Sequence, residues 1–188
     1  MMPRTVYPLV CVLLMVLACT DGMPTDSSGA SFSTAGRNAF GFNGSASGFP
    51  TGAVRLTGGG SYDPATASNV IPTETSASFS GGFDCTATVS QGPLSGCQEG
   101  EGVRWDTVQL LASAGFKCTG ADAAKVATTG PGTAVILADF YRAGDGNEDS
   151  FTAQMIVSDT DLAPEIPGTQ TLWVQGVGCG IANGHFNS

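Results

Sequence analysis

The sequence predicts one all-β domain, a single antiparallel β-sandwich or small β-barrel with two disulfides. Apolar residues make up 41% of the 188 residues, enough to bury a core. Charged residues make up only 12%, whereas amphipathic helices need charged outer faces. About seven short segments with apolar residues at alternate positions are separated by turn residues, the pattern of sandwiches and barrels.

The chain begins with a segment typical of export. Arg4 precedes an apolar run that ends at Ala18 and is too short for a stable membrane-spanning helix, so residues 1–18 are interpreted as a signal peptide. Residues 19–37 are small and polar, with Gly and Pro, and predict a flexible tether. The all-β domain is therefore expected to span residues 38–188.

The end of the signal carries a resemblance to a known class. Val16-Leu17-Ala18-Cys19 resembles the lipobox of bacterial lipoproteins, although Leu is commoner at the place of Val16 and a small residue at that of Leu17. The resemblance implies cleavage before Cys19, attachment of a diacylglycerol to its thiol so that more than one acyl chain, such as palmitate, is carried, and an anchor in the cell membrane or outer membrane. Thr20, which is not Asp, points to the outer membrane where one exists. The alternative is plain secretion.

The first half of the domain predicts strands separated by loops. Strands are expected at Ala39–Asn43, Gly52–Thr57 and Ser76–Val89, with loops at Pro64–Thr75 and Ser90–Gly102. The run Gly58–Gly60 lacks the lysine and spacing of a phosphate-binding loop. It predicts instead a twisted or bulged strand in which backbones approach closely.

The segment Val103–Cys118 predicts a long strand. Its apolar residues fall at every second position (Val108, Leu110, Ala112, Ala114, Phe116 and Cys118). A helix is the competing interpretation, because Asp106 and Gln109 have capping-box spacing and Gly115 could end it. The alternation favours the strand. A short helical turn is expected at Asp122–Lys125.

A hairpin dominates the second half. Thr133–Arg142 is apolar on both faces through Ala138, as in a central strand, and Ser150–Val157 alternates. Their connection is rich in Gly, Asp and Asn, which favour turns. A loop at Asp159–Gly168, a final long strand at Thr171–Cys179 and an edge at Ile181–Phe186 complete the prediction.

Four cysteines remain after Cys11 and Cys19 are assigned to the signal and the lipid: Cys85, Cys97, Cys118 and Cys179. An even number in an exported chain predicts two disulfides, with three connectivities open. We favour Cys85–Cys97, which closes a loop of hairpin size, and Cys118–Cys179, which ties down the last strand. A catalytic thiol is disfavoured, since the one histidine, His185, lies near the end.

Two kinds of chemistry remain as alternatives. Asp145, Asn147 and Asp149 could ligate Ca²⁺ and make the domain a calcium-stabilised binding module. The EF-hand pattern fails, because Ser150 replaces its glycine and Ile156 its glutamate, so a solvated turn is the expected state. A secreted carbohydrate-active or other hydrolase could draw a carboxylate pair from Asp106, Asp139, Glu148 and Asp149, but no spacing singles out a pair.

The remaining signals favour a binding or structural role at the cell envelope. A formal charge of −9 repels phosphate backbones and argues against nucleic acid. Trp105, Tyr141 and Trp173 could line a sugar-binding face, though core packing is expected for most of them. Gly144–Ala153 and Trp173–Gly180 resemble, diffusely, exported bacterial all-β domains of unassigned activity. The leading hypothesis is a lipid-anchored, non-enzymatic domain with an envelope or extracellular partner.

Overall fold

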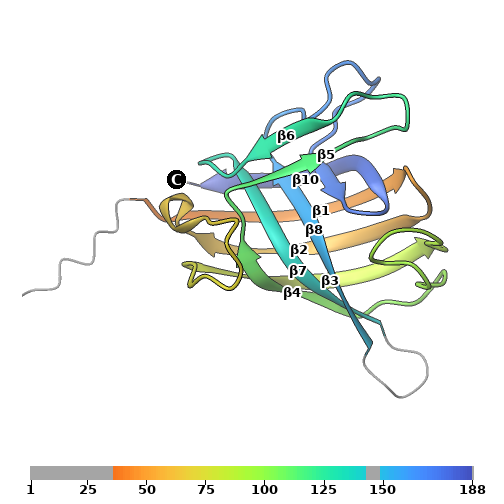
Figure 1. The fold of residues 1–188 in the computed structure, drawn as a ribbon, viewed down its shortest axis with the longest axis horizontal. Helices are drawn as coiled ribbons and strands as arrows, with labels where there is room; N and C mark the ends of the chain where they lie inside the picture. The colour runs from red at the N-terminus through yellow and green to blue at the C-terminus, as the bar shows by residue number, and fades with distance from the viewer. Residues whose placement is uncertain (1–35, 143–148, 188) are drawn as a thin grey trace, which may run out of the picture. The chain divides into compact units, whose positions relative to one another are not determined.

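Eight strands close into an antiparallel barrel in the computed structural model, which describes residues 36–142 and 149–187 (Figure 1). The barrel strands are β1 (Asn38–Gly48), β2 (Ala53–Tyr62), β3 (Ala77–Ala87), β4 (Arg104–Leu110), β7 (Thr133–Arg142), β8 (Asp149–Ser158), β9 (Leu172–Val174) and β10 (Gly178–Asn187). A separate hairpin comprises β5 (Ser113–Phe116) and β6 (Lys125–Thr128), and one 3-10 turn, η1, spans Pro64–Thr66. The predicted all-β class is confirmed, and of the two architectures the barrel is the one formed.

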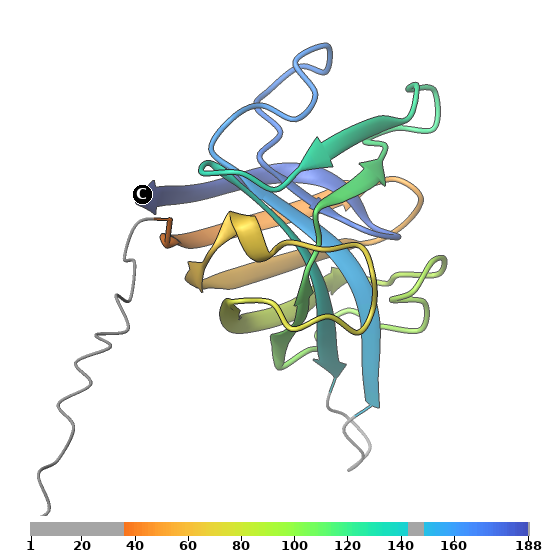
Figure 2. The ribbon, with the colours of Figure 1, turned by 60° about the vertical axis from the view of Figure 1, so that its left-hand side comes forward.

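Barrel strands that follow one another in the sequence are also neighbours in the sheet. The β5–β6 hairpin is inserted in the chain between β4 and β7, which pair with each other directly. Because the strands alternate in direction, the connections gather at two ends. The terminal end holds Asn38, Asn187 and the connection 63–76 with η1 (Figures 1 and 2). The loop end holds connections 49–52 and 88–103. These two names are kept below.

The barrel interior is filled by aromatic side chains. Phe40 contacts Phe42, Tyr62 and Phe79 with ring centroids 4.9–6.0 Å apart, and Phe42 lies 6.1 Å from Trp105. Trp105 is fully buried, and its Nε1 donates a hydrogen bond to the Thr57 carbonyl at 2.9 Å. An eight-stranded barrel is just wide enough for such rings, so the inward faces form a packed core.

Glycines let β1, β2 and β3 pass close to one another. A Cβ at Gly81 would lie 1.7 Å from the Thr57 carbonyl oxygen, and one at Gly59 would lie 2.2 Å from that of Phe40. The ladder keeps one register through Gly58–Gly60 and shifts only near Ala53. The predicted close approach is confirmed.

A second core lies outside the barrel, under the β5–β6 hairpin. Phe116 and Ala127 of the hairpin pack with outward-facing Val135, Ile156 and Trp173 of β7, β8 and β9. This packing explains why Thr133–Ala138 is apolar on both faces: one face lines the barrel and the other the second core. The predicted central hairpin is confirmed as β7 and β8, which pair from Thr133–Ser158 to Arg142–Asp149.

The single strand predicted for Val103–Cys118 is wrong. The β4–β7 register shifts between Thr107 and Gln109, and Val108 at this bulge is 46% exposed. Leu110 then packs in the barrel interior and Leu111 in the second core, so the chain leaves the barrel here. The alternation thus combined residues of two different cores.

Two further predictions are wrong. The helical turn expected at Asp122–Lys125 is a turn at residues 120–121, after which Lys125 opens β6. The long final strand is two strands, because Gly176 and Gly178 adopt positive φ angles between β9 and β10. The expected edge at Ile181–Phe186 is part of β10 and pairs with β1 to close the barrel.

Both favoured disulfides are confirmed. Cys85–Cys97 joins β3 to the connection that follows it, with 12 residues of separation. Cys118–Cys179 joins the segment after β5 to β10, with a separation of 61. The second bond therefore fastens the external hairpin to the barrel wall.

The phenol of Tyr62 is hydrogen-bonded at the terminal end, and its pKa is raised. Its hydroxyl donates to the Gly130 carbonyl at 2.7 Å, with the Pro131 carbonyl at 3.1 Å. Burial, and secondarily the charge of Asp159, raises the pKa of Tyr62 from 10.0 to about 12. Between these values the folded state retains a proton that the unfolded state releases, so stability falls as pH rises.

We therefore expect Tyr62→Phe to remove part of this pH dependence. Below pH 10 the stabilisation from the raised pKa is fully present, and it is lost as pH approaches 12. Denaturant unfolding at several pH values in this interval should show a steeper loss for the wild type than for Tyr62→Phe. Parallel losses would contradict the assignment.

Candidate functional site

The structure brings together two of the predicted carboxylates, on the outer wall of the barrel. Asp106 and Asp139 face each other directly in the β4–β7 ladder. Asp106 Oδ2 accepts a hydrogen bond from Arg104 Nε at 3.3 Å, and Asp139 Oδ1 accepts one from Thr152 Oγ1 at 2.6 Å. Both project from one sheet surface, whereas a glycosidase pair flanks the scissile bond from two sides. Glu148 lies outside the described residues.

The predicted calcium ligands are described only in part. Asp145 and Asn147 lie outside the described residues. Asp149 Oδ2 accepts a hydrogen bond from Arg142 Nη2 at 2.9 Å, so the guanidinium group of Arg142 already pairs with this carboxylate. Within residues 36–142 and 149–187, no three His, Cys, Asp or Glu side chains are grouped to hold a metal ion.

The three strand aromatics have separate roles. Trp105 packs inside the barrel, and Trp173 packs in the second core with its Nε1 donating to the Lys117 carbonyl at 3.0 Å. Tyr141 faces outward, and the guanidinium of Arg104 lies 4.2 Å from its ring centroid. The packing role expected for most of these residues is therefore confirmed for the two tryptophans.

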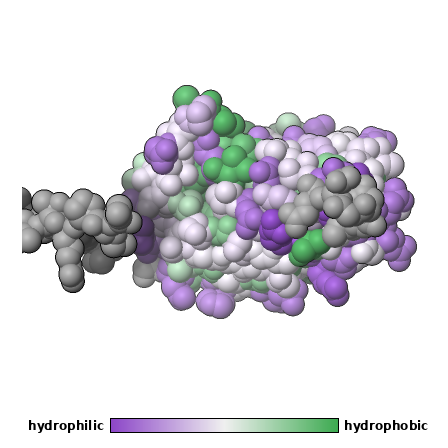
Figure 3. All heavy atoms as spheres, turned by 90° about the horizontal axis from the view of Figure 1, so that it is seen from below, coloured by the Kyte–Doolittle hydropathy of each residue, from purple (hydrophilic) through white to green (hydrophobic). Residues whose placement is uncertain are grey.

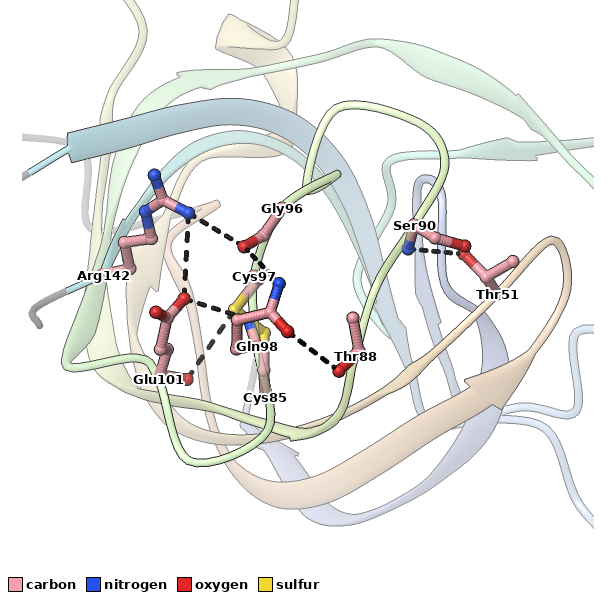
Figure 4. Close-up of a disulfide and its surroundings, with 9 residues drawn as sticks. All are labelled: Thr51, Cys85, Thr88, Ser90, Gly96, Cys97, Gln98, Glu101 and Arg142. Carbon is pink, nitrogen blue, oxygen red and sulfur yellow. Dashed lines mark hydrogen bonds and ion pairs between the residues drawn. A yellow bond between two sulfur atoms is a disulfide. The ribbon is translucent and has the colours of Figure 1, made fainter.

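A polar network closes the loop end of the barrel around the first disulfide (Figure 4). Arg142 Nη1 donates to the Gly96 carbonyl at 2.8 Å and lies 3.7 Å from Glu101 Oε2. The same Glu101 atom accepts the backbone N–H of Gln98 at 2.9 Å. These contacts, with Cys85–Cys97, hold the connection 88–103 over the core, where Leu94 is fully buried. The network therefore acts as a cap.

Two hollows on the outer wall meet at Phe49, and we call them together the Phe49 groove. The first, of about 500 Å³, is lined by Ser45, Ser47, Gly48, Phe49, Cys118, Thr119, Gly120, Ile166, Gln170, Cys179, Gly180 and Ile181. The second, of about 400 Å³, is lined by Phe49, Pro50, Gly115, Phe116, Lys117, Ala124, Trp173 and Gly176. Both volumes are typical of small-ligand sites.

Phe49 is held in place from two sides. Its backbone N–H donates to the Val177 carbonyl at 3.0 Å, which fixes the β1–β2 connection against the β9–β10 turn. Its ring lies against Gly120, where a Cβ would be 3.0 Å from the nearest ring carbon. The residue remains half-buried and lines both hollows.

The groove offers neutral polar groups beside an aromatic ring. Ser45, Ser47, Thr119 and Gln170 supply hydroxyl and amide groups. Among the described lining residues, Lys117 alone is charged, although the whole chain carries −9. Such a lining favours a ligand without charge that presents both an apolar face and hydrogen-bonding groups.

No motif in the sequence marks the Phe49 groove. Its walls come from five segments that are far apart in the chain. They are β1, the β1–β2 connection, the segment after β5, the loop that precedes β9, and β10 itself. The disulfide between Cys118 and Cys179 is the one sequence signal, since it predicts that two of these segments meet.

Comparisons with known proteins identify no relative of this chain. No family model matches the chain, and no curated protein or solved structure matches it either. In the part of the chain that the structure describes, no helix is long and apolar enough to cross a membrane. Function is therefore inferred from the residues of this chain.

Proposed function

We propose that this chain is a lipid-anchored β-barrel domain of the cell envelope that binds an uncharged saccharide in the Phe49 groove without catalysis. One observation carries the proposal: the interior is packed with aromatic side chains, whereas a groove built on a disulfide opens on the outer wall. Aromatic faces beside hydroxyl and amide groups suit sugars, which have an apolar face and a hydroxyl-bearing edge.

Two features support export and anchoring. Disulfides persist in oxidising compartments outside the cytosol, and this domain has two. The lipobox-like context of Cys19 favours acylation, and more than one acyl chain gives stable attachment. The domain would then be displayed on the cell membrane or outer membrane, or released if Cys19 is not acylated.

Acylation of Cys19 can be tested by intact mass. The chain is expressed in a bacterium with its own signal, and its mass is compared before and after reduction and thiol alkylation. We expect a mass increased by acyl chains, with the thiols of Cys85, Cys97, Cys118 and Cys179 alkylated only after reduction. Palmitate labelling that survives Cys19→Ala, or an unlipidated chain beginning at Cys19, would overturn the anchor.

Binding in the groove can be tested with immobilised neutral oligosaccharides. Phe49→Ala should weaken binding by about tenfold, because loss of an aromatic contact of about 1.4 kcal/mol changes the Kd by that factor. Val126→Ala, at an exposed valine outside the groove, is the matched control and should bind as the wild type does. Binding that is unaffected by Phe49→Ala, or restricted to acidic glycans, would contradict the proposal.

A further inference from the structure

An apolar loop protrudes near the terminal end of the barrel. Within the segment Ser68–Thr73, which we call the apolar loop, Val70 is 71% exposed and Ile71 56% exposed. Val108, turned outward by the β4 bulge, lines a hollow of about 360 Å³ together with Ile71 and Pro72. Figure 3 shows hydrophobic residues gathered toward the terminal end of one face, among neutral and polar ones.

Specific hydrogen bonds hold this loop outward. Gln109 is 2% exposed, and its Nε2 donates to the carbonyls of Ser68 at 2.7 Å and Val70 at 2.9 Å. Asn69 exchanges hydrogen bonds with Ser113, from Nδ2 to Oγ and from the Ser113 N–H to Oδ1, both at 3.1 Å. A buried amide and an Asn–Ser pair thus fix a conformation in which two large apolar side chains face solvent. Contiguous apolar surface held outward in this way marks a contact surface when neighbouring residues extend it, as Pro72 and Val108 do in the same hollow as Ile71.

The amino-terminal segment joins the barrel next to this connection. Asn38 pairs with Tyr62, where the connection 63–76 begins, and Arg37 Nη2 donates to Ser76 Oγ at 3.3 Å, where it ends. The predicted tether, residues 19–37, comprises 19 residues. A flexible chain of this length has a root-mean-square span of roughly 25 Å. Acylated Cys19 would therefore keep the terminal end close to a bilayer.

We propose that the apolar loop rests on a lipid surface, with Val70 and Ile71 at the boundary between head groups and acyl chains. The inference depends on the proposed acylation of Cys19, because two side chains alone bind weakly and the tether supplies a high local concentration. The loop sequence Ser-Asn-Val-Ile-Pro-Thr has no charge, and the nearest charge along the chain is Glu74, which follows the loop and lines the same hollow as Ile71 and Pro72. Since the chain carries −9, zwitterionic lipid should be preferred to anionic lipid.

The orientation that follows connects the loop to the proposed binding site. Phe49 lies in the connection 49–52 of the loop end, whereas the apolar loop lies in the connection 63–76 of the terminal end. A domain resting on the apolar loop holds Phe49 away from the bilayer. The Phe49 groove would then open toward ligands outside the membrane.

Tryptophan fluorescence in brominated lipid tests this contact. Acylated protein, verified by intact mass, is reconstituted in phosphatidylcholine vesicles with and without brominated chains, as the wild type, Ile71→Trp and Val126→Trp. Val126 is 70% exposed on β6 and serves as the matched position, while buried Trp105 and Trp173 give the same background in every sample. We expect the added emission of Ile71→Trp to shift to the blue and to be quenched by bromine, and that of Val126→Trp to remain unshifted and unquenched.

The possible outcomes separate the two proposals. A missing acyl mass would refute the anchor before any fluorescence is recorded. With the acyl mass present, equal quenching at both positions, or none at Ile71→Trp, would overturn lipid contact and leave the anchor standing. A blue shift of Ile71→Trp that is already present in detergent and grows with protein concentration would also overturn it, because a second copy would then cover the loop.

Discussion

Replacement of Cys118 and Cys179 by alanine is expected to destabilise the domain by about 4 kcal/mol. The bond closes a segment of 61 residues, and in the chain-entropy model the cost of releasing such a loop is of this size. Both cysteines also pack in the second core, so the β5–β6 hairpin loses its covalent attachment to β10. Urea unfolding of the wild type and the double variant under oxidising conditions measures the difference.

The matched control is the other disulfide. Cys85→Ala with Cys97→Ala releases a segment of only 12 residues, for which the same model gives about 3 kcal/mol. A larger loss of stability for the Cys85–Cys97 pair would contradict the argument from loop length.

The double variant at Cys118 and Cys179 should also lose groove binding, because that bond forms part of the groove wall.

Trp105→Ala is expected to cost about 3–5 kcal/mol, the range observed when a large buried aromatic is truncated. Trp105 is fully buried in the barrel, and its ring lies so close to Gly58 that a Cβ there would be 2.6 Å away. The variant leaves a cavity in the interior and removes the donor to the Thr57 carbonyl. Denaturant unfolding followed by circular dichroism measures the loss.

Trp105→Phe separates the two contributions. It retains an aromatic ring and so leaves a smaller cavity, but it removes the hydrogen bond to Thr57, which is worth about 1 kcal/mol. Its stability should lie between that of the wild type and that of Trp105→Ala. If both variants were within 1 kcal/mol of the wild type, the interior would not be packed as described.

Local signals predicted the parts of this fold that depend on local sequence. The β7–β8 hairpin follows from two apolar runs around a turn-rich segment, and β7, apolar on both faces, is central because the second core covers its outer face. The even number of cysteines in the domain predicted two disulfides with three connectivities open, and the favoured pair, a hairpin-sized loop and a bond to the last strand, is the one formed. In these cases the residues whose pattern supports the prediction are the same residues that pair in the hairpin or form the disulfide.

Other features depend on contacts between distant segments. The alternation through Val108 and Phe116 does not reveal that the chain passes from one core to another at Leu110 and Leu111. The pairing of Asp106 with Asp139 requires the β4–β7 register, which a bulge shifts. The Phe49 groove similarly has no motif, since its walls meet only after the barrel closes.

The closure of the barrel by its first and last strands affects the order of events during synthesis. β1 pairs with β10 from Ala39–Asn187 to Gly48–Gly178, so one edge of β1 finds its partner only when the last residues of the domain have emerged. Until then, β1 presents unpaired backbone groups, which are a site for aggregation. Contacts between distant parts of the chain also slow folding. A chain in which β10 is not yet available therefore leaves one edge of β1 open to pairing with other chains.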